Sequence, residues 1–104
     1  MRKYRNIPTV VEGEKFDSKK EAARFADLKI LERIGEITNL TCHPKYEFVH
    51  NGIKIGTYTP DFRYLNGDKK EIVEDTKSKP TITTSYRLRK KMMLAFFGIE
   101  VQEV

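Results

Sequence analysis

The chain has 104 residues, 38% of them apolar, and its 20 Lys and Arg against 15 Asp and Glu give a net charge of +5. This length suits one hydrophobic core and excludes two ordinary domains, while the basic balance favours an anionic partner, nucleic acid first. The single cysteine excludes an internal disulfide framework and is typical of a reducing compartment. The longest apolar run, residues 92–97, is too short to span a bilayer. We therefore expect a cytoplasmic protein with no membrane partner.

Two parts are expected along the chain. Residues 1–8 are basic and predict an exposed arm, and residues 9–104 predict a single domain, because no linker or repeat divides them. Within this domain, residues 10–16 carry Glu12-Gly13 between two short strand-like pairs and predict a hairpin.

A helix is predicted next. Ser18 followed by Glu21 has the spacing of a capping box, and apolar residues recur at helical spacing up to Ile34, directly before Gly35. These signals predict a helix from about residue 18 to 34.

The middle of the chain has strand-like patterns. Two Asn-Gly dipeptides, at 51–52 and 66–67, separate such runs and are strong hairpin signals. We therefore predict an antiparallel meander, closed by Pro80. The predicted strands are 37–41, 46–50, 53–58, 61–65 and 70–77.

A second helix and a last strand follow. Thr83 or Thr84 is a suitable N-cap, Gly98 ends the helical pattern, and residues 99–104 read as a strand. The order of elements, α-β-β-β-α-β, predicts an α/β or α+β fold in which two helices flank a central mixed sheet.

Carboxylates around the second Asn-Gly turn form a candidate site. Asp75 and Lys77 share one strand face, which suits either an ordinary charged pair in solvent or a reactive site. Asp61 follows Pro60, which marks a bulge or a sheet edge that re-aims the next side chain. A two-residue turn at Asn66-Gly67 would point Asp61 away from Asp75. An odd-length loop or a bulge would bring the two together.

Glu21 is the third carboxylate of this candidate site. It lies at the start of the apolar helix stripe, so its carboxylate either completes the capping box or turns towards the sheet. With Asp61 and Asp75 it would form an oxygen-only set that suits Mg²⁺, for which Mn²⁺ would substitute. Such a site, with Lys77 to orient a water and stabilise negative charge, suffices for phosphodiester hydrolysis.

These residues resemble the PD-(D/E)XK nuclease superfamily. The resemblance rests on Pro60-Asp61, thirteen intervening residues and Asp75-Thr76-Lys77, preceded by the helical Glu21. The segments "FDSKKEA", "YTPDFRY", "VEDTKS", "YRLRKK" and "FGIEV" look like a family of small phage and prophage nuclease-like proteins. That family is similar in turn to phage Holliday-junction resolvases, which act on branched DNA.

The resemblance implies a restriction-endonuclease-like core and a magnesium-dependent DNA endonuclease in the host cytoplasm. It also implies Glu21, Asp61 and Asp75 as metal ligands and catalytic residues, with Lys77 as the catalytic lysine. Glu74 takes the place of Asp75 as ligand if the strand is shifted by one residue.

Basic residues of the second helix are candidates for phosphate contact. An ordinary solvated cationic face is the alternative, but a neighbouring phosphodiesterase site favours contact with a DNA backbone, duplex or branched. A chain of this length has little room for a target-recognition domain, so we expect selectivity for DNA shape, or a homodimer that places two sites across a junction. The candidate residues are Lys79, Arg87, Arg89, Lys90 and Lys91.

Other chemistries fit the sequence less well. Cys42-His43 has no second Cys or His pair at ligand spacing, which argues against a zinc site. We find no glycine-rich phosphate loop and no serine or cysteine triad, so nucleotide cofactors and triad hydrolases are not expected. The alternative function is a non-catalytic nucleic-acid-binding module of a phage or prophage. Nicking or double-strand cleavage, and the preferred DNA shape, are left open by the sequence.

Overall fold

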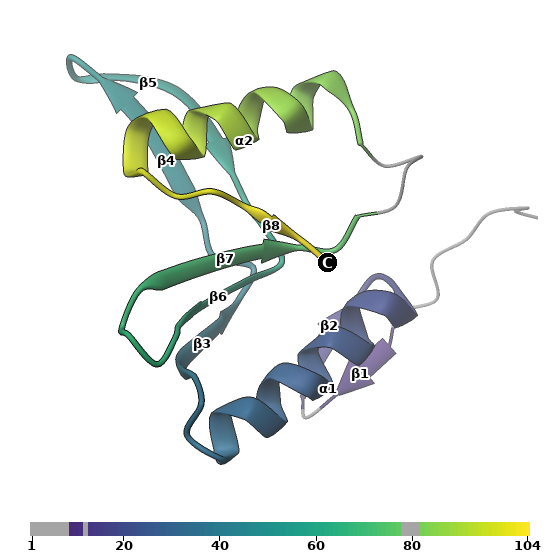
Figure 1. The fold of residues 1–104 in the computed structure, drawn as a ribbon. Coiled ribbons are helices and arrows are strands. Elements are labelled where there is room, and N and C mark those ends of the chain that lie inside the picture. Colours follow the sequence, from purple (N-terminus) through teal and green to yellow (C-terminus); the bar gives the residue numbers. More distant parts are fainter. Residues whose placement is uncertain (1–8, 12, 78–81) are drawn as a thin grey trace, which may run out of the picture.

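A mixed four-stranded sheet lies between two helices (Figure 1). The computed structural model describes residues 9–11, 13–77 and 82–104, so the arm predicted over residues 1–8 lies outside the described residues. The elements are β1 (Thr9–Val11), β2 (Glu14–Phe16), α1 (Lys19–Arg33), β3 (Thr38–Cys42), β4 (Tyr46–His50), β5 (Ile53–Tyr58), β6 (Phe62–Leu65), β7 (Glu71–Asp75), α2 (Thr84–Phe97) and β8 (Gln102–Glu103). The predicted mixed α and β class is confirmed.

The sheet has the order β3-β6-β7-β8, in which β7 pairs with β8 in parallel and the other pairs are antiparallel. Helix α1 and the β1–β2 hairpin lie below the sheet in Figure 1, and α2 and the β4–β5 hairpin lie above it. Each face therefore has its own apolar core. One core contains Phe16, Phe25 and Phe62, and the other contains Val73 and Met93.

Helix α1 begins where the capping signal predicted it. Ser18 has extended backbone, and its side chain accepts a hydrogen bond of 3.1 Å from the backbone N–H of Glu21. The buried stripe is Ala22, Phe25 and Leu28, and the ring of Phe25 lies 4.9 Å from that of Phe16. The helix thereby packs on β2 and on the sheet at once, which fixes the position of its first turn.

The prediction of an antiparallel meander is wrong, because the strands from β3 to β6 do not pair in chain order. The β4–β5 hairpin forms as predicted at Asn51-Gly52, where both residues have positive φ, but it makes a separate two-stranded sheet. Strand β3 pairs directly with β6 instead. The reason is packing, because Phe48 of β4 and Tyr58 of β5 are buried in the core on the α2 side. That burial draws the hairpin out of the plane of the main sheet.

The connection between β6 and β7 has an odd number of residues. The register pairs Leu65 with Glu71, which leaves residues 66–70 in the loop. The side-chain oxygen of Asn66 accepts hydrogen bonds from the N–H groups of Asp68 and Lys70, at 2.9 and 3.0 Å, and holds the loop in shape. The structure thus has the loop parity that points Asp61 and Asp75 to the same side of the sheet.

Helix α2 begins and ends at the predicted caps. Thr83 caps its start, and Gly98, at φ +68°, caps its end. Its buried residues are Tyr86 and Met93, whereas Leu88 is 57% exposed. Neither helix of the described chain is long and apolar enough to cross a membrane.

Candidate functional site

Three side chains converge beside the first turn of α1. One potential ligand atom each from Glu21, His43 and Asp61 lies within 4.8 Å of the other two. Glu21 belongs to α1, His43 directly follows β3, and Asp61 directly precedes β6. The pairing of β3 with β6 therefore brings two of the groups together, and the packing of α1 brings the third.

The carboxylate of Glu21 turns towards the sheet. Its Oε2 atom lies 2.7 Å from Nε2 of His43, while its backbone N–H is capped by Ser18. Among the described contacts, only the Ser18 half of the capping box forms. Burial, followed by the charge of Asp61, raises the pKa of Glu21 above its usual value. Because burial and Asp61 disfavour the charged form of Glu21, a cation bound beside it would stabilise the charged carboxylate.

His43 was missed as a site residue by the sequence interpretation. Its backbone N–H donates a hydrogen bond of 2.8 Å to the carbonyl of Asp61, and its φ of +52° turns the chain out of β3. Its neighbour Cys42 does not share the role, because burial and nearby carboxylates raise the pKa of this thiol to about 12. No local pattern marks His43, since its partners are 22 residues before it and 18 after it.

Asp61 and Asp75 are in contact. The register that pairs Phe62 with Glu74 places these two residues opposite each other when it is continued by one step. Asp61 is held by Thr76, whose backbone N–H donates to Oδ2 at 2.7 Å and whose hydroxyl donates to the same atom. Tyr58 donates a hydrogen bond of 2.5 Å to Asp75.

The environment of Asp75 disfavours its charge. Burial is the main cause, and the neighbouring Asp61 adds to it, so the pKa of Asp75 is raised to about 7 although Tyr58 and Lys77 act in the opposite direction. Glu21, Asp61 and Asp75 therefore form a chain of carboxylates in which Asp61 is the middle member. Repelling carboxylates of this kind fit a divalent cation, whose charge would offset the repulsion.

Lys77 completes the site from the end of β7. Its Nζ atom lies 3.7 Å from Oδ2 of Asp75 and 4.4 Å from the ring centroid of Tyr86 in α2. Its carbonyl accepts a hydrogen bond of 2.8 Å from Lys20, which ties the start of α1 to the end of β7. The lysine is thus held between the carboxylates and the second helix, with its side chain 20% exposed.

Glu74, the alternative to Asp75, lies on the opposite face of the sheet. Its two carboxylate oxygens accept hydrogen bonds from Arg24 at 2.7 and 2.6 Å, and Tyr64 donates a third at 2.5 Å. The residue is 2% exposed. Because its acceptors are engaged by α1 and β6, the carboxylate beside Asp61 is that of Asp75.

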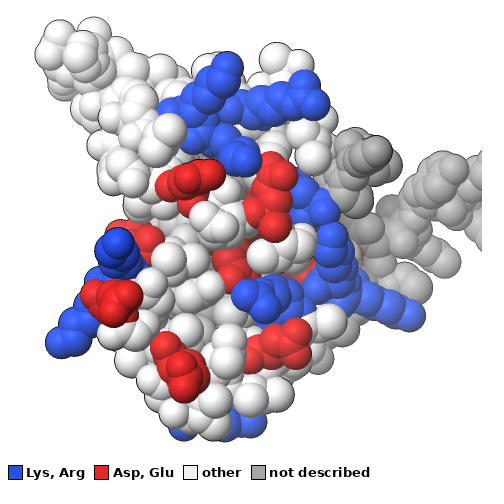
Figure 2. Space-filling model, in the orientation of Figure 1, with Lys and Arg blue, Asp and Glu red and all other residues white. Residues whose placement is uncertain are grey.

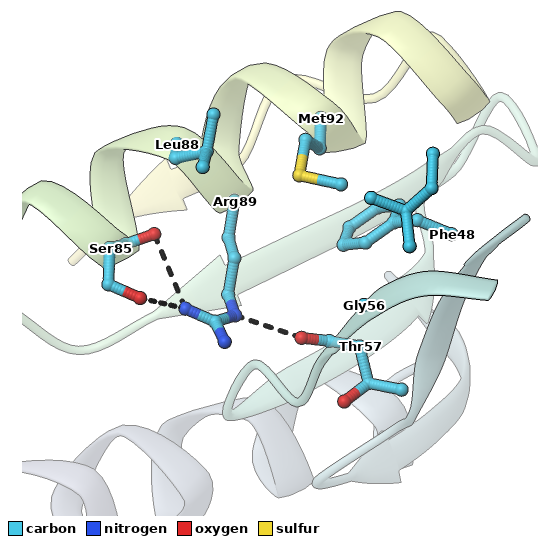
Figure 3. Close-up of a pocket in the computed structure, with 8 residues that line it drawn as sticks. Phe48, Gly56, Thr57, Ser85, Leu88, Arg89 and Met92 are labelled. Atoms are coloured by element: carbon cyan, nitrogen blue, oxygen red, sulfur yellow. Dashed lines mark hydrogen bonds between the residues drawn. The ribbon is translucent and has the colours of Figure 1, made fainter.

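The predicted phosphate-binding residues have different environments. Arg87 and Lys91 are exposed and one helical turn apart, whereas Lys90 pairs with Glu103 at 3.1 Å. The guanidinium of Arg89 is engaged within the protein, because it donates to the carbonyl of Thr57 at 2.9 Å and also contacts Ser85 (Figure 3). Lys79 lies outside the described residues.

Arg89 lines a groove of about 200 Å³ between α2 and the β4–β5 hairpin (Figure 3). In this position it joins the hairpin to the helix.

Across the face in Figure 2, basic side chains gather over α2 and near the start of α1, with acidic side chains between them. The basic surface is therefore divided and flanks an acidic region.

Comparison with known protein families matches the chain to a family model. The family model described as "Protein of unknown function (DUF1064)" matches residues 1–102. No curated protein and no solved structure matches the chain. The match includes every residue of the carboxylate cluster as well as His43 and Lys77. The chain belongs to the DUF1064 family.

Proposed function

We propose that this chain is a metal-dependent DNA endonuclease that hydrolyses phosphodiester bonds and selects branched DNA. The observation that carries the proposal is the contact of Asp61 with Asp75, with Lys77 at 3.7 Å from Asp75 and Glu21 within reach of Asp61. The order of helix, strands, helix and strand around a mixed sheet supports a restriction-endonuclease-like core. The resemblance to PD-(D/E)XK nucleases names the same residues.

The donor set fits a divalent cation. Glu21, Asp61 and Asp75 would hold it, and such an ion, when bound, lowers the pKa of a water and neutralises charge on a phosphate. Thr76 keeps Asp61 oriented through its N–H and hydroxyl. Tyr58 does the same for Asp75. These contacts hold the carboxylates before DNA arrives, as catalysis by preorganisation requires.

Lys77 would act on the attacking water and on the reacting phosphate. Its ammonium lies beside Asp75 and is steered by the ring of Tyr86. From there it orients the water and stabilises the negative charge that develops on the phosphate. Arg87 and Lys91, exposed on α2, would contact the DNA backbone on the same side of the sheet as Tyr86.

Cleavage assays test this proposal. The protein is incubated with supercoiled plasmid and with a synthetic four-way junction, in the presence of Mg²⁺, Mn²⁺ or EDTA. We expect cleavage with either metal, none with EDTA, and faster cleavage of the junction. Asp75→Asn and Lys77→Ala should abolish cleavage and keep junction binding, while Lys54→Ala, on the β4–β5 hairpin, serves as the matched control.

The alternative function is a non-catalytic nucleic-acid-binding module. It is favoured by the exposed pair Arg87 and Lys91, which needs no metal to bind phosphate. Junction binding without cleavage under any metal condition supports this alternative. Cleavage that persists in both Asp75→Asn and Lys77→Ala refutes the site assignment.

A further inference from the structure

His43 places an imidazole among the carboxylates of the site. Its Nε2 atom lies 2.7 Å from Oε2 of Glu21, and the ligand atoms of His43, Glu21 and Asp61 all lie within 4.8 Å of one another. Ligands of one ion bound at about 2.1 Å are separated by roughly 3 to 4 Å, so the 2.7 Å hydrogen bond between His43 and Glu21 would lengthen slightly as an ion takes the place of its proton. The set therefore contains a nitrogen donor beside two oxygen donors.

The fold fixes the imidazole in this place. His43 has left-handed backbone, with φ of +52°, and its N–H is bonded to the carbonyl of Asp61 at 2.8 Å. Its ring centroid lies 6.0 Å from that of the fully buried Phe16. The side chain is still 41% exposed. One side of the imidazole thus packs towards the core, while part of it is accessible to an ion and its waters.

A nitrogen donor changes which ion the site prefers. Mg²⁺ binds oxygen ligands almost exclusively, whereas imidazole binds first-row transition ions well. Mn²⁺ accepts both carboxylate oxygen and imidazole nitrogen. We propose that His43 is a nitrogen ligand of the ion held by Glu21 and Asp61, and that the site therefore binds Mn²⁺ in preference to Mg²⁺. This inference rests on the metal centre of the proposed function.

Pulsed electron paramagnetic resonance of bound Mn²⁺ tests the ligand directly, without any cleavage assay. The protein, freed of metal and loaded with one equivalent of Mn²⁺, should show nuclear modulation from a coordinated ¹⁴N atom. Labelling the histidines with ¹⁵N should replace that modulation with the ¹⁵N pattern. This measurement needs no substitution, so it shows whether a histidine nitrogen is coordinated even if a variant misfolds.

Two variants assign the signal, because the chain has two histidines. His43→Gln keeps a hydrogen-bond donor for Glu21 but removes the imidazole, and it should abolish the nitrogen modulation. We also expect its affinity for Mn²⁺, measured by calorimetry, to fall about tenfold or more, with a smaller loss for Mg²⁺. His50→Gln, at the exposed end of β4, should leave both the modulation and the affinities unchanged.

The outcomes separate this inference from the proposed function. Nitrogen modulation in a protein that cuts no DNA supports His43 as a ligand and refutes the proposed nuclease function. Metal-dependent cleavage with no nitrogen modulation, or with modulation that persists in His43→Gln, overturns the His43 ligand and leaves the nuclease in place. Loss of cleavage in His43→Gln with unchanged Mn²⁺ affinity also overturns it, because the histidine would then only orient Glu21.

Discussion

Glu74 and Asp75 are neighbours in β7, yet their carboxylates have opposite surroundings. Glu74 is neutralised by Arg24 through two hydrogen bonds, whereas Asp75 lies against Asp61 and has a pKa raised to about 7 by burial and by that neighbour. The first carboxylate stabilises the fold, and the second is held in a position where its charge is unfavourable. Residues kept at a cost to stability are typical of functional sites.

The two carboxylates should therefore respond differently to neutralisation. We expect Glu74→Gln to lower the free energy of unfolding by about 2 to 3 kcal/mol, because it leaves Arg24 without its charged partner. Asp75→Asn, measured in EDTA, should change it by less than about 1 kcal/mol or raise it. Urea denaturation at pH 7 measures both. A loss in Asp75→Asn as large as that in Glu74→Gln would contradict this assignment.

The ring of Tyr86 should matter for catalysis through Lys77. Removing the ring in Tyr86→Leu frees the ammonium, so kcat for junction cleavage should fall about 3- to 30-fold, the range expected from a lost cation–π contact, with KM little changed. Tyr86→Phe retains the ring and loses only the hydrogen bond to Glu103, so it should keep most of kcat. Thermal melts of both variants, recorded beside the kinetics, exclude unfolding as the cause. Equal losses in the two variants would indicate a structural role alone.

The salt dependence of DNA binding should separate the basic residues of α2. Arg87→Ala and Lys91→Ala should each reduce the slope of log K against log salt by about 0.9, the value for one lost phosphate contact. Arg89→Ala should leave the slope unchanged and lower the free energy of unfolding by about 1 kcal/mol, because it removes the bond to Thr57. Fluorescence anisotropy with a labelled junction, at several salt concentrations, measures the slopes.

Acid stability should depend on Glu71. Burial raises the pKa of Glu71, but hydrogen bonds from Arg63 at 2.7 Å and Tyr46 at 2.5 Å outweigh it and leave the pKa below its usual value. The stabilisation is complete above the unfolded pKa of about 4.3 and disappears as the pH falls through the lower folded value. Urea midpoints of the wild type should therefore fall below pH 5 more steeply than those of Glu71→Gln. At pH 7 the variant should be less stable by about 1 kcal/mol. Parallel acid profiles would contradict the prediction.

Local sequence signals predicted much of the fold. Ser18 caps α1, Asn51-Gly52 makes a hairpin, and Thr83 with Gly98 bounds α2, as the sequence predicted. Each of these signals depends on backbone groups within a few residues, so spacing along the chain is enough to detect it. The pairing of β3 with β6 depends instead on where Phe48 and Tyr58 are buried. That is a property of the packed core, and the meander was predicted wrongly for this reason.

The candidate site divides in the same way. Asp61, Asp75, Lys77 and Glu21 were selected by residue type and spacing, and the structure brings them to one end of the sheet. The roles of His43 and Arg89 were not predicted. The partner of His43, Asp61, is 18 residues away, and that of Arg89, Thr57, is 32 residues away, and neither spacing follows a sequence pattern. An arginine on a basic helix looks the same in sequence whether it faces solvent or a carbonyl.

The separate β4–β5 hairpin has a consequence for how such a chain can change. Cys42 and Phe62 are paired in the main sheet, so the segment between them leaves the sheet and returns to it at the same point. His43 and Asp61 are the first and last residues of this segment, and a backbone hydrogen bond joins them. These two residues are held by the main sheet, whereas the β4–β5 hairpin between them is held mainly by its packing against α2. The exposed tip of the β4–β5 hairpin, residues 49–55, can be lengthened, shortened or exchanged while the two site residues stay in place. The chain thus keeps a fixed reactive end and carries, on the same short insertion, a part that is free to diversify.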